Sequence, residues 1–355
     1  MFKNEPIVNS SFIINSYFVN QARTALRLLL SSVSDKKLKV GVQVFTCYTV
    51  FQAIKNAGHE IIFLDIDNNY ALDAECLNKQ IKNLDVLIIT HTFGFIDKIV
   101  EASYLPKNLI IIEDCAHSFG STYMGIETGK IFDAAIYSFG LGKWPPIGTG
   151  GLAIVNCHSK FPLLLSNMAK LKHRAMPIHF DIFLLLIESV VLSPIFYSVF
   201  AMIVNVLSKN KIDFIGKYKF NEFVGDKAIL IWISKNIARI NKLLEISRSN
   251  TSLLRSLIPA LSYPSFDSSI TCPNHYIFPI MHELRDEIFD DLKKNGITAG
   301  KHFQGSIEWA KRFGYSEGSC PNAERIVKNI LTLPVHPGVK KNSIEKIASI
   351  VNQYC

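Results

Sequence analysis

A chain of 355 residues is too long for one simple hydrophobic core, so its length favours two domains or one large α/β domain with an appendage. Hydrophobic residues make up 48% of the sequence and charged residues 19%, which excludes a largely disordered protein. The net charge of +8 suits an anionic small molecule, an acidic membrane surface or nucleic acid, but nucleic acid is the weakest of these because no long run of Lys/Arg occurs.

Short β-rich runs alternate with helical stretches through the first half of the chain. Strands are expected at 39–46, 61–65, 86–91, 109–114, 133–139 and 151–156, and helices at 50–57 and 74–81. Strands rich in Val and Ile, separated by helices, predict a mostly parallel sheet that helices cover on both faces. Ligands of such sheets bind outside the carboxyl ends of the strands, which directs attention to Thr46, His91, Asp114 and Ser138.

The C-terminal part has a different pattern, typical of a smaller α+β domain. It combines a long helix at 228–261, a strand at 276–281, a helix at 284–295 and a closing helix from Ser343. We therefore expect a large α/β domain at 1–175, an apolar helical insertion or interface segment at 176–225, and a C-terminal α+β domain at 226–355.

The apolar stretch from Ile182 to Leu207 is unusual because Glu188 is its only charged residue. Its length would suffice to span a bilayer. A single crossing, however, would place the two halves of one active site on opposite sides of the membrane, and Pro194 divides the stretch into two shorter helices. Two alternatives remain. We favour buried helices at a subunit interface over a hairpin that rests in one leaflet at the cytoplasmic face of a membrane.

The seven cysteines are scattered and form no CxxC pair. This argues against a disulfide framework and against a thiolate zinc site, so no metal is expected, and it suits a reducing cytosol. The first residues lack the basic-then-apolar run of a signal peptide, which also predicts a cytoplasmic protein.

The densest chemical signal joins the segments 111–120, 137–143 and 148–151. An apolar strand that ends in Asp114 places a carboxylate at the rim of the sheet, and Lys143 follows the strand that ends near Ser138. Alone, such an Asp is usually a helix N-cap and such a Lys is usually solvated. Together they suit pyridoxal chemistry, which needs a lysine that forms a Schiff base and moves protons, a carboxylate facing the pyridine nitrogen, and donors for the phosphate.

The order of these motifs resembles the DegT-type sugar aminotransferases, which have the aspartate-aminotransferase fold and use pyridoxal 5'-phosphate (PLP) on nucleotide-linked keto sugars. The family's E-D-x-A-[QH] motif stands at 113–117, its S-F-x-x-x-K motif at 138–143 and its G-x-G-G return at 148–151. Weaker matches stand at 57–67, 91–94, 285–297, 320–324 and 333–337. The resemblance covers nearly the whole chain and implies a PLP-dependent transferase of fold type I.

The resemblance implies roles for individual residues. Lys143 is implied as the Schiff-base lysine and Asp114 as the partner of the ring nitrogen, and these two are the expected catalytic residues. His117 takes the position that contacts the phenolic oxygen or the face of the cofactor ring. Ser138 is implied as a phosphate ligand, although a strand-end cap explains it equally well on sequence alone.

Two cofactor-binding motifs depart from the family pattern. The phosphate-binding S-G-T-x-A-L motif appears at 21–26 with Arg23 in place of the usual threonine, and Thr24 beside it is an alternative source of a hydroxyl. The aromatic residue that commonly covers the cofactor ring is Cys47 here, so stacking falls to Tyr48 or is lost. PLP binding is still expected through these positions.

The leading hypothesis is an aminotransferase that moves an amino group, expected to come from glutamate, to a nucleotide-activated keto-deoxysugar for lipopolysaccharide or a similar polysaccharide. Lys143 would take the proton from the carbon of the amino donor and return it elsewhere on the adduct of donor and cofactor, as a general acid–base group. His302 and His336 are candidate substrate contacts. The resemblance also implies a homodimer, but the family's G-x-N-x-R stretch, whose asparagine reaches the neighbouring subunit's phosphate, is not recognisable, and Asn221 is a guess at its replacement.

Two other functions are weighed against this one. A sugar dehydratase is disfavoured because that branch of the family replaces the lysine with histidine, and Lys143 is present. A PLP-binding regulatory or membrane-associated protein that has lost transamination is the alternative from another class, motivated by Arg23, Cys47 and the segment 182–207. The sequence leaves the sugar, its reacting carbon, the nucleotide and the amino donor open.

Overall fold

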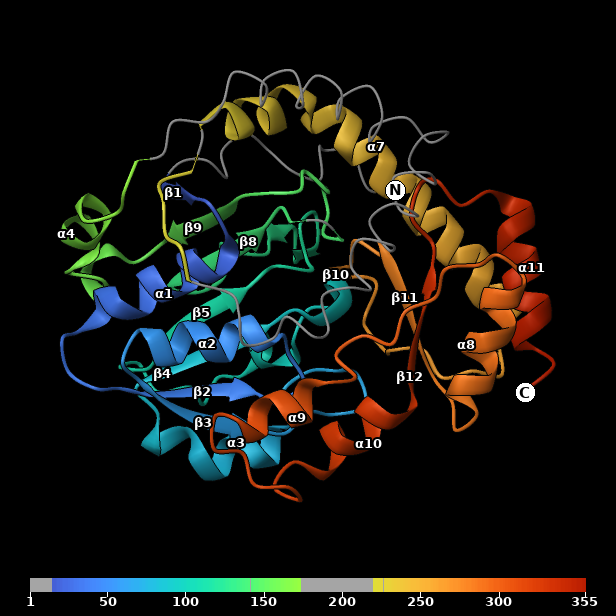
Figure 1. The fold of residues 1–355 in the computed structure, drawn as a ribbon, viewed down its shortest axis with the longest axis horizontal. Helices are drawn as coiled ribbons and strands as arrows, with labels where there is room; N and C mark the ends of the chain where they lie inside the picture. The colour runs from blue at the N-terminus through green and yellow to red at the C-terminus, as the bar shows by residue number, and fades with distance from the viewer. Residues whose placement is uncertain (1–14, 141, 174–219, 226) are drawn as a thin grey trace.

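The structure is a computed structural model that describes residues 15–140, 142–173, 220–225 and 227–355 (Figure 1). A seven-stranded sheet of order β1-β9-β8-β5-β4-β2-β3 lies at its centre. Its strands are β1 (Ser16–Val19), β2 (Lys39–Gln43), β3 (Glu60–Leu64), β4 (Val86–Thr90), β5 (Ile110–Asp114), β8 (Ala134–Ser138) and β9 (Gly151–Val155). Strands β3, β2, β4, β5 and β8 run parallel, and β9 runs antiparallel to both of its neighbours, β8 and β1, so that β1 has the direction of the parallel strands. The predicted mostly parallel sheet is confirmed.

Helices cover both faces of this sheet. On one face lie α1 (Ala22–Val33) and α2 (Tyr48–Asn56), which pack on Val40, Val42 and Ile88, with α4 (Leu164–Ala169) beside α1. On the other face, α3 (Ala74–Gln80) packs on Leu87 and Ile89. Because both faces are covered, β4 is buried along its whole length, which explains its continuous apolar run.

The long helix α7 (Lys227–Leu257) connects the sheet with the C-terminal part of the chain (Figure 1). Its first half, including Trp232 and Ile240, belongs to the apolar cluster on β8 and β9. Its last turns, at Leu254, join the separate cluster formed by the C-terminal elements. The helix is therefore shared between two cores, and the domain boundaries at 175 and 226 remain a prediction.

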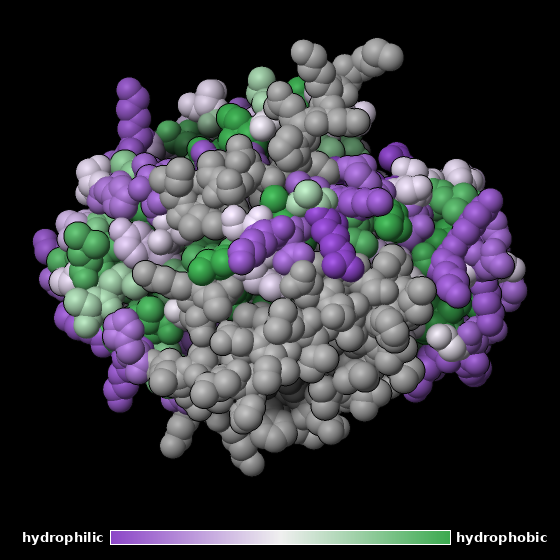
Figure 2. All heavy atoms as spheres, turned by 90° about the horizontal axis from the view of Figure 1, so that it is seen from above, coloured by the Kyte–Doolittle hydropathy of each residue, from purple (hydrophilic) through white to green (hydrophobic). Residues whose placement is uncertain are grey.

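The C-terminal elements form a small α+β unit. Strands β11 (Ile277–Met281) and β12 (Ile330–Pro334) pair antiparallel, and α8 (Arg285–Lys294) and α11 (Lys341–Val351) pack against them. The outward faces of these two helices are hydrophilic (Figure 2, right). Helices α9 (Ser306–Lys311) and α10 (Pro321–Asn329) pack instead on the α1–α2 face of the large sheet.

Short elements complete the described part of the chain. They are strands β6 (Thr122–Tyr123), β7 (Ile126–Glu127) and β10 (Thr271–Cys272), and the 3-10 helices η2 (Ile81–Asn83), η3 (Thr92–Gly94), η4 (Lys98–Glu101) and η5 (His158–Lys160). Strand β10 of the C-terminal part pairs with β6 of the large part, so the two parts also share a small sheet.

The predicted apolar segment 182–207 lies outside the described residues. None of the helices within the described ranges is long and apolar enough to cross a membrane.

A buried carboxylate of the large part caps a helix of the C-terminal part. Asp65 follows β3, and its Oδ2 and Oδ1 accept the backbone N–H groups of Asn322 and Ala323 at 3.0 and 2.8 Å. These N–H groups belong to the first turn of α10, whose own N-cap residue Cys320 provides no side-chain acceptor. Asp65 therefore supplies from a distance the acceptor that a helix N-terminus needs.

We predict that Asp65→Ala lowers the free energy of unfolding by about 2 kcal/mol, because the half-buried N–H of Asn322 and the buried N–H of Ala323 lose their acceptor. Asp73→Ala is the matched control, since Asp73 caps α3 through one N–H at 2.8 Å within the large part, and it is expected to cost about 1 kcal/mol. Urea unfolding measures both. Limited proteolysis should cleave near α10 only in Asp65→Ala, and an equal, unchanged cleavage pattern in both variants would contradict the capping role.

Candidate functional site

A pocket lies at the carboxyl ends of the parallel strands, and the space of about 500 Å³ at this place includes open solvent. Its walls come from the ends of β4, β5 and β8, the first turns of α1 and α2, the loop that carries Lys143, and one residue of the C-terminal part. The sequence-predicted residues that line it are Arg23, Thr46, Cys47, Asp114, His117, Ser138 and Lys143. The structure thus brings together most of the predicted site from five separate elements.

Asp114 ends β5 and is buried in this pocket. Its Oδ1 accepts the backbone N–H of Ala116 at 3.0 Å. Burial raises the pKa of the Asp114 carboxyl, while the N–H of Ala116 and the charges of Lys143 and His91 act in the opposite direction. A buried carboxylate of this kind is stabilised in its charged form by a cationic partner.

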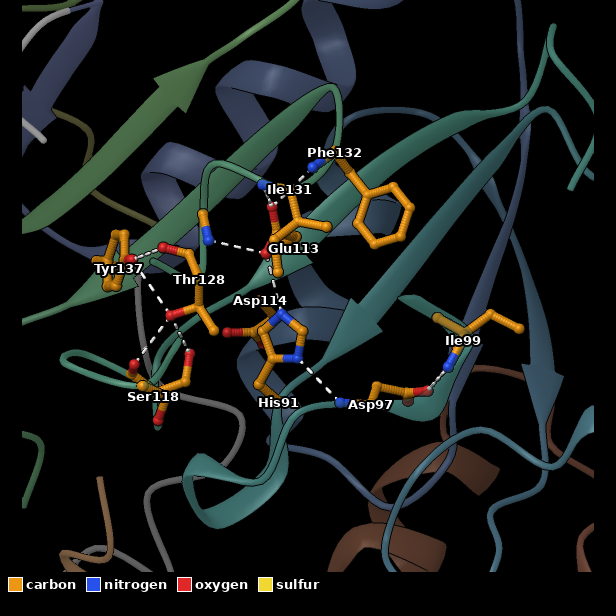
Figure 3. Close-up of polar contacts among 12 residues, drawn as sticks. His91, Asp97, Ile99, Glu113, Asp114, Ser118, Thr128, Ile131, Phe132 and Tyr137 are labelled. Carbon is orange, nitrogen blue, oxygen red and sulfur yellow. Dashed lines mark hydrogen bonds and ion pairs between the residues drawn. The ribbon is translucent and has the colours of Figure 1, made fainter. Parts of the chain in front are cut away.

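The neighbouring Glu113 points away from the pocket, because adjacent residues of a strand face opposite sides of the sheet. Figure 3 shows its carboxylate surrounded by donors. It accepts backbone N–H groups from Gly129, Ile131 and Phe132 at 2.7, 2.9 and 3.0 Å, and His91 Nε2 lies 3.0 Å from Oε2. Glu113 is therefore a fully hydrogen-bonded structural carboxylate that fixes the loop before β8.

His91, which the sequence places at a strand end, is turned into the core and does not line the pocket. The backbone N–H of Asp97 donates to His91 Nδ1 at 3.2 Å, so Nε2 carries the proton and donates to Glu113 (Figure 3). Cys115 lies beside these two side chains. The three residues offer possible metal-ligand atoms that lie within 4.8 Å of one another. Since the Glu113 oxygens and both His91 nitrogens already have partners, we assign the cluster a structural role.

Lys143 reaches the pocket from a tight turn after β8. Its backbone N–H donates to the carbonyl of Gly140 at 3.1 Å, and Gly142 within this turn has a φ of +80°, which favours glycine. Burial lowers the pKa of the Lys143 amine, and Cys47 and Asp114 act in the opposite direction. A lowered pKa increases the fraction of neutral amine, the form that attacks a carbonyl and accepts a proton.

Two histidines with defined tautomers stand beside Lys143. The backbone N–H of Phe93 donates to His117 Nδ1 at 3.3 Å, so the proton of neutral His117 is on Nε2. Thr332 Oγ1 donates to the carbonyl of Gly300 at 3.0 Å and lies 2.6 Å from His302 Nδ1, so Nδ1 of neutral His302 carries the proton and Nε2 is an acceptor. The ring centroids of the two histidines are 6.3 Å apart.

Burial keeps both histidines neutral at pH 7. It lowers the pKa of His117 well below its usual value, with further lowering by the charges of Lys143 and His302. It lowers the pKa of His302 to about 4, again with a contribution from Lys143. The pocket thus presents one N–H donor, on His117, while the imidazole acceptor of His302 lies next to the lining residue Phe303 and does not line the cavity itself.

The first turns of α1 and α2 both border the pocket. Neither N-cap residue, Gln21 for α1 or Cys47 for α2, makes a side-chain cap hydrogen bond. The start of β9 lies directly against α1, since a Cβ on Gly151 would come within 2.3 Å of the backbone nitrogen of Ala22. Two helix N-termini and the guanidinium of Arg23 give this side of the pocket the character of an anion site.

Several predicted residues lie elsewhere. Thr24 lies on the buried side of α1, where its hydroxyl donates to Asn20 Oδ1 at 3.0 Å. Tyr48 packs against Phe313 with ring centroids 5.3 Å apart. Thr24, Tyr48, Asn221, His302 and His336 do not line the pocket. Their predicted roles in cofactor, phosphate or substrate binding stay predictions, without a place in this cavity.

Thr90 and Phe303 are two of the lining residues that sequence reasoning did not single out. Thr90 ends β4 and is paired in register with Asp114, so its position follows from the parallel strand order. Its Oγ1 is buried and has no hydrogen-bond partner among the described residues. Phe303 belongs to the C-terminal part, and no local pattern in the sequence points to it.

A helix-covered, mostly parallel sheet with one reversed strand, β9, that carries a half-buried lysine and a buried carboxylate together at its carboxyl edge, is the architecture of PLP-dependent transferases of fold type I. The chain belongs to the DegT/DnrJ/EryC1/StrS aminotransferase family, whose model matches residues 15–161 and 234–352. Members of this family are PLP-dependent, so PLP is its cofactor.

Similar proteins agree with this assignment. The chain is 32% identical to a GDP-perosamine synthase from Escherichia coli O157:H7 over 136 residues, a match that spans only 37% of each protein. It is 25% identical to a pleiotropic regulatory protein from Geobacillus stearothermophilus over 87% of this chain and 77% of the relative. The fold also matches the sugar aminotransferase CalS13 from Micromonospora echinospora, with a TM-score of 0.71, 16% identity, and coverage of 96% of this chain and 87% of that one.

The residues present fit PLP. The pocket combines an amine at Lys143, a buried carboxylate at Asp114, and a cationic, N–H-rich side at the starts of α1 and α2, which match an aldehyde, a pyridine nitrogen and a phosphate. Thr90 Oγ1 adds a buried hydroxyl that a polar ligand atom in the pocket would satisfy.

The low pKa of His302 makes a specific contribution to stability. Between pH 4 and 6.5 the unfolded chain binds a proton at His302 that the folded protein does not, so this contribution is complete above pH 6.5 and decreases as the pH falls. We predict that His302→Gln reduces the loss of unfolding free energy between pH 7 and pH 5 by about 1–2 kcal/mol. Urea unfolding at both pH values measures the difference.

Asp97, whose pKa burial raises to about 6, contributes with the opposite sign, but it is common to both proteins and cancels in the comparison. His158→Gln, which removes an exposed histidine, is the control and should leave the pH dependence unchanged. Equal pH dependence in wild type and His302→Gln would contradict the neutral state of His302 in the folded protein.

Proposed function

We propose that this chain is a PLP-dependent aminotransferase that transfers an amino group from glutamate to a nucleotide-linked keto-deoxysugar, for the biosynthesis of a surface polysaccharide. Family membership supports the reaction type. A relative named GDP-perosamine synthase supports a nucleotide-linked sugar as the substrate class. The observation that carries the proposal is the convergence of Lys143 and Asp114 in one pocket with two helix N-termini.

Each residue has a defined task in this proposal. Asp114 faces the pyridine nitrogen and keeps it protonated, and its buried position makes a cationic partner favourable. The starts of α1 and α2, with Arg23 and Ser138, hold the phosphate. When bound, PLP supplies a ring that stabilises negative charge on the carbon of the amino donor.

Lys143 moves the proton. Its amine lies in the same pocket as Asp114 and has a lowered pKa, so a neutral amine would be available to take the proton from the donor carbon and return it to the carbon that joins donor and cofactor, and to move a proton in the reverse sense once the keto sugar is bound. His117 Nε2–H is a hydrogen-bond donor toward an oxygen of the cofactor, and His302 Nε2 is an acceptor for a hydroxyl of the sugar. Lys143, Asp114 and His117 line one cavity, which supplies the proximity that the proton transfers need.

We further propose a homodimer, in which the segment 182–207 packs at the interface and a residue of the partner completes phosphate binding. The expected division into domains at 1–175, 176–225 and 226–355 belongs to the same proposal. Catalysis by the dimer would take place in the cytoplasm, where nucleotide-linked sugars are made.

We predict that borohydride treatment of the purified holoprotein attaches the pyridoxyl group to Lys143. The assignment follows from the position of this amine in the pocket, and peptide mass spectrometry locates the label. Lys160, which pairs with Asp133 at 2.8 Å, is a convenient internal control and should stay unlabelled. A label on any other lysine, or none, would exclude the assigned site.

We predict that Asp114→Asn keeps measurable PLP affinity but lowers single-turnover rates by about 10²–10³-fold, because a neutral amide cannot keep the ring nitrogen protonated. Asp133→Asn is the matched control, since Asp133 is a half-buried carboxylate outside the pocket. Stopped-flow absorbance with glutamate gives the rates. Near-normal rates in Asp114→Asn would remove this residue from the mechanism.

A second function has one specific observation in its favour, the match over 87% of this chain to a protein named a pleiotropic regulatory protein. In that case the chain would bind PLP without transamination. Glutamate separates the two functions, because a transaminase converts the bound cofactor to its amine form and changes its absorption. A labelled Lys143 with a spectrum that glutamate leaves unchanged would favour the regulatory function.

A further inference from the structure

The walls of the pocket contain few rings that could face a planar cofactor. Cys47 occupies the wall at the start of α2, and its thiol cannot stack as an aromatic ring does. Tyr48 beside it packs on Phe313 and does not line the pocket. Among the described residues that do line it, only His117 and Phe303 carry rings.

The rings of His117 and Phe303 share one orientation. Their planes differ by 11° and their centroids are 5.6 Å apart. Phe93 continues the arrangement, at 13° from His117 and 18° from Phe303. A planar ring that lies flat against Phe303 is therefore parallel to His117 as well, as stacked heteroaromatic rings require.

Phe303 is held firmly in this orientation. Phe45, which is fully buried, meets it edge-to-face at 5.1 Å and 89°. Its backbone has a φ of +57°, which side chains with a Cβ rarely adopt, and its carbonyl accepts the N–H of Ser306 at 2.8 Å. Residues kept in this conformation occur preferentially where a side chain must be aimed at a ligand.

We propose that Phe303 is the aromatic residue that covers the PLP ring in this protein. It belongs to the C-terminal part and replaces the aromatic ring that is missing at position 47. This inference rests on the proposed placement of PLP against Lys143 and Asp114. Phe303 is the one lining residue of the described chain that comes from beyond α7, so contact with PLP also ties the C-terminal part to the large part.

The first test measures PLP affinity. Phe303→Leu keeps an apolar side chain but removes the ring, and it should weaken PLP binding about three- to tenfold, whereas Phe303→Tyr should bind within about twofold of wild type. Phe313→Leu is the matched control, because it removes a ring that packs on Tyr48 outside the pocket, and it should leave the affinity unchanged. Absorbance titration of the apoprotein with PLP gives the dissociation constants, and circular dichroism of the bound cofactor band reports the ring environment.

The second test uses hydrogen exchange, and its deciding comparison is made on the wild-type protein. Addition of PLP to wild-type apoprotein should slow exchange in the segment 299–306, and Phe303→Tyr should keep this protection. If Phe303→Leu does not fold, this comparison decides alone, and an unchanged segment 299–306 would overturn the inference.

The outcomes separate this inference from the proposed function. Failure of borohydride to label Lys143 in wild type removes the proposed site itself. A labelled Lys143 with unchanged PLP affinity in Phe303→Leu, accompanied by a raised KM for the nucleotide sugar, would instead assign Phe303 to the sugar and overturn its role toward the cofactor.

Discussion

Two carboxylates that follow one another at the end of β5 organise the whole site. Because neighbouring residues of a strand face opposite sides, Asp114 enters the pocket while Glu113 enters the protein behind it. Glu113 accepts three backbone N–H groups and one imidazole N–H, which fixes the loop at 129–132 and thereby the start of β8. Strand β8 in turn leads to Ser138 and Lys143. The fully hydrogen-bonded carboxylate of Glu113 therefore fixes the elements that bring Asp114 and Lys143 into one pocket.

The C-terminal part is attached to the same region by a second buried polar group. Asn274 is fully buried, and its Nδ2 donates to the carbonyls of His117 and Phe119 at 2.8 and 3.0 Å. The contact is close, since a Cβ on Gly94 would lie 2.1 Å from the side-chain oxygen of Asn274. The loop after Asp114 is thus held from both sides, by the sheet and by the C-terminal part. His117 owes its position to this loop, so the pocket depends on how the two parts of the chain pack together.

Sequence reasoning predicted the sheet because its strands are buried on both faces and therefore read as continuous apolar runs, as β4 does. It missed β1, whose four residues lie at the edge of the sheet, and it missed α10, whose N-terminal acceptor comes from Asp65 across the molecule. The candidate site was predicted where local motifs carry it, at Asp114 and Lys143. Thr90 and Phe303 were not predicted. The position of Thr90 follows from strand register and that of Phe303 from long-range packing, and neither can be derived from a local sequence pattern.

The two departures from the family pattern have different physical consequences. At the start of α1, the loss of a threonine hydroxyl leaves the helix N-terminus in place, and the guanidinium of Arg23 adds a charge that a hydroxyl does not have. At the start of α2, Cys47 leaves no ring, and nothing in the backbone substitutes for one. An anion site tolerates replacement of one hydrogen-bond donor by another, because several N–H groups and positive charges bind the anion together. A stacking surface, in contrast, needs one flat group in one orientation. That requirement explains why a replacement for the missing ring is expected far away in the sequence, on a turn such as that of Phe303, where the backbone and Phe45 fix the plane of the ring.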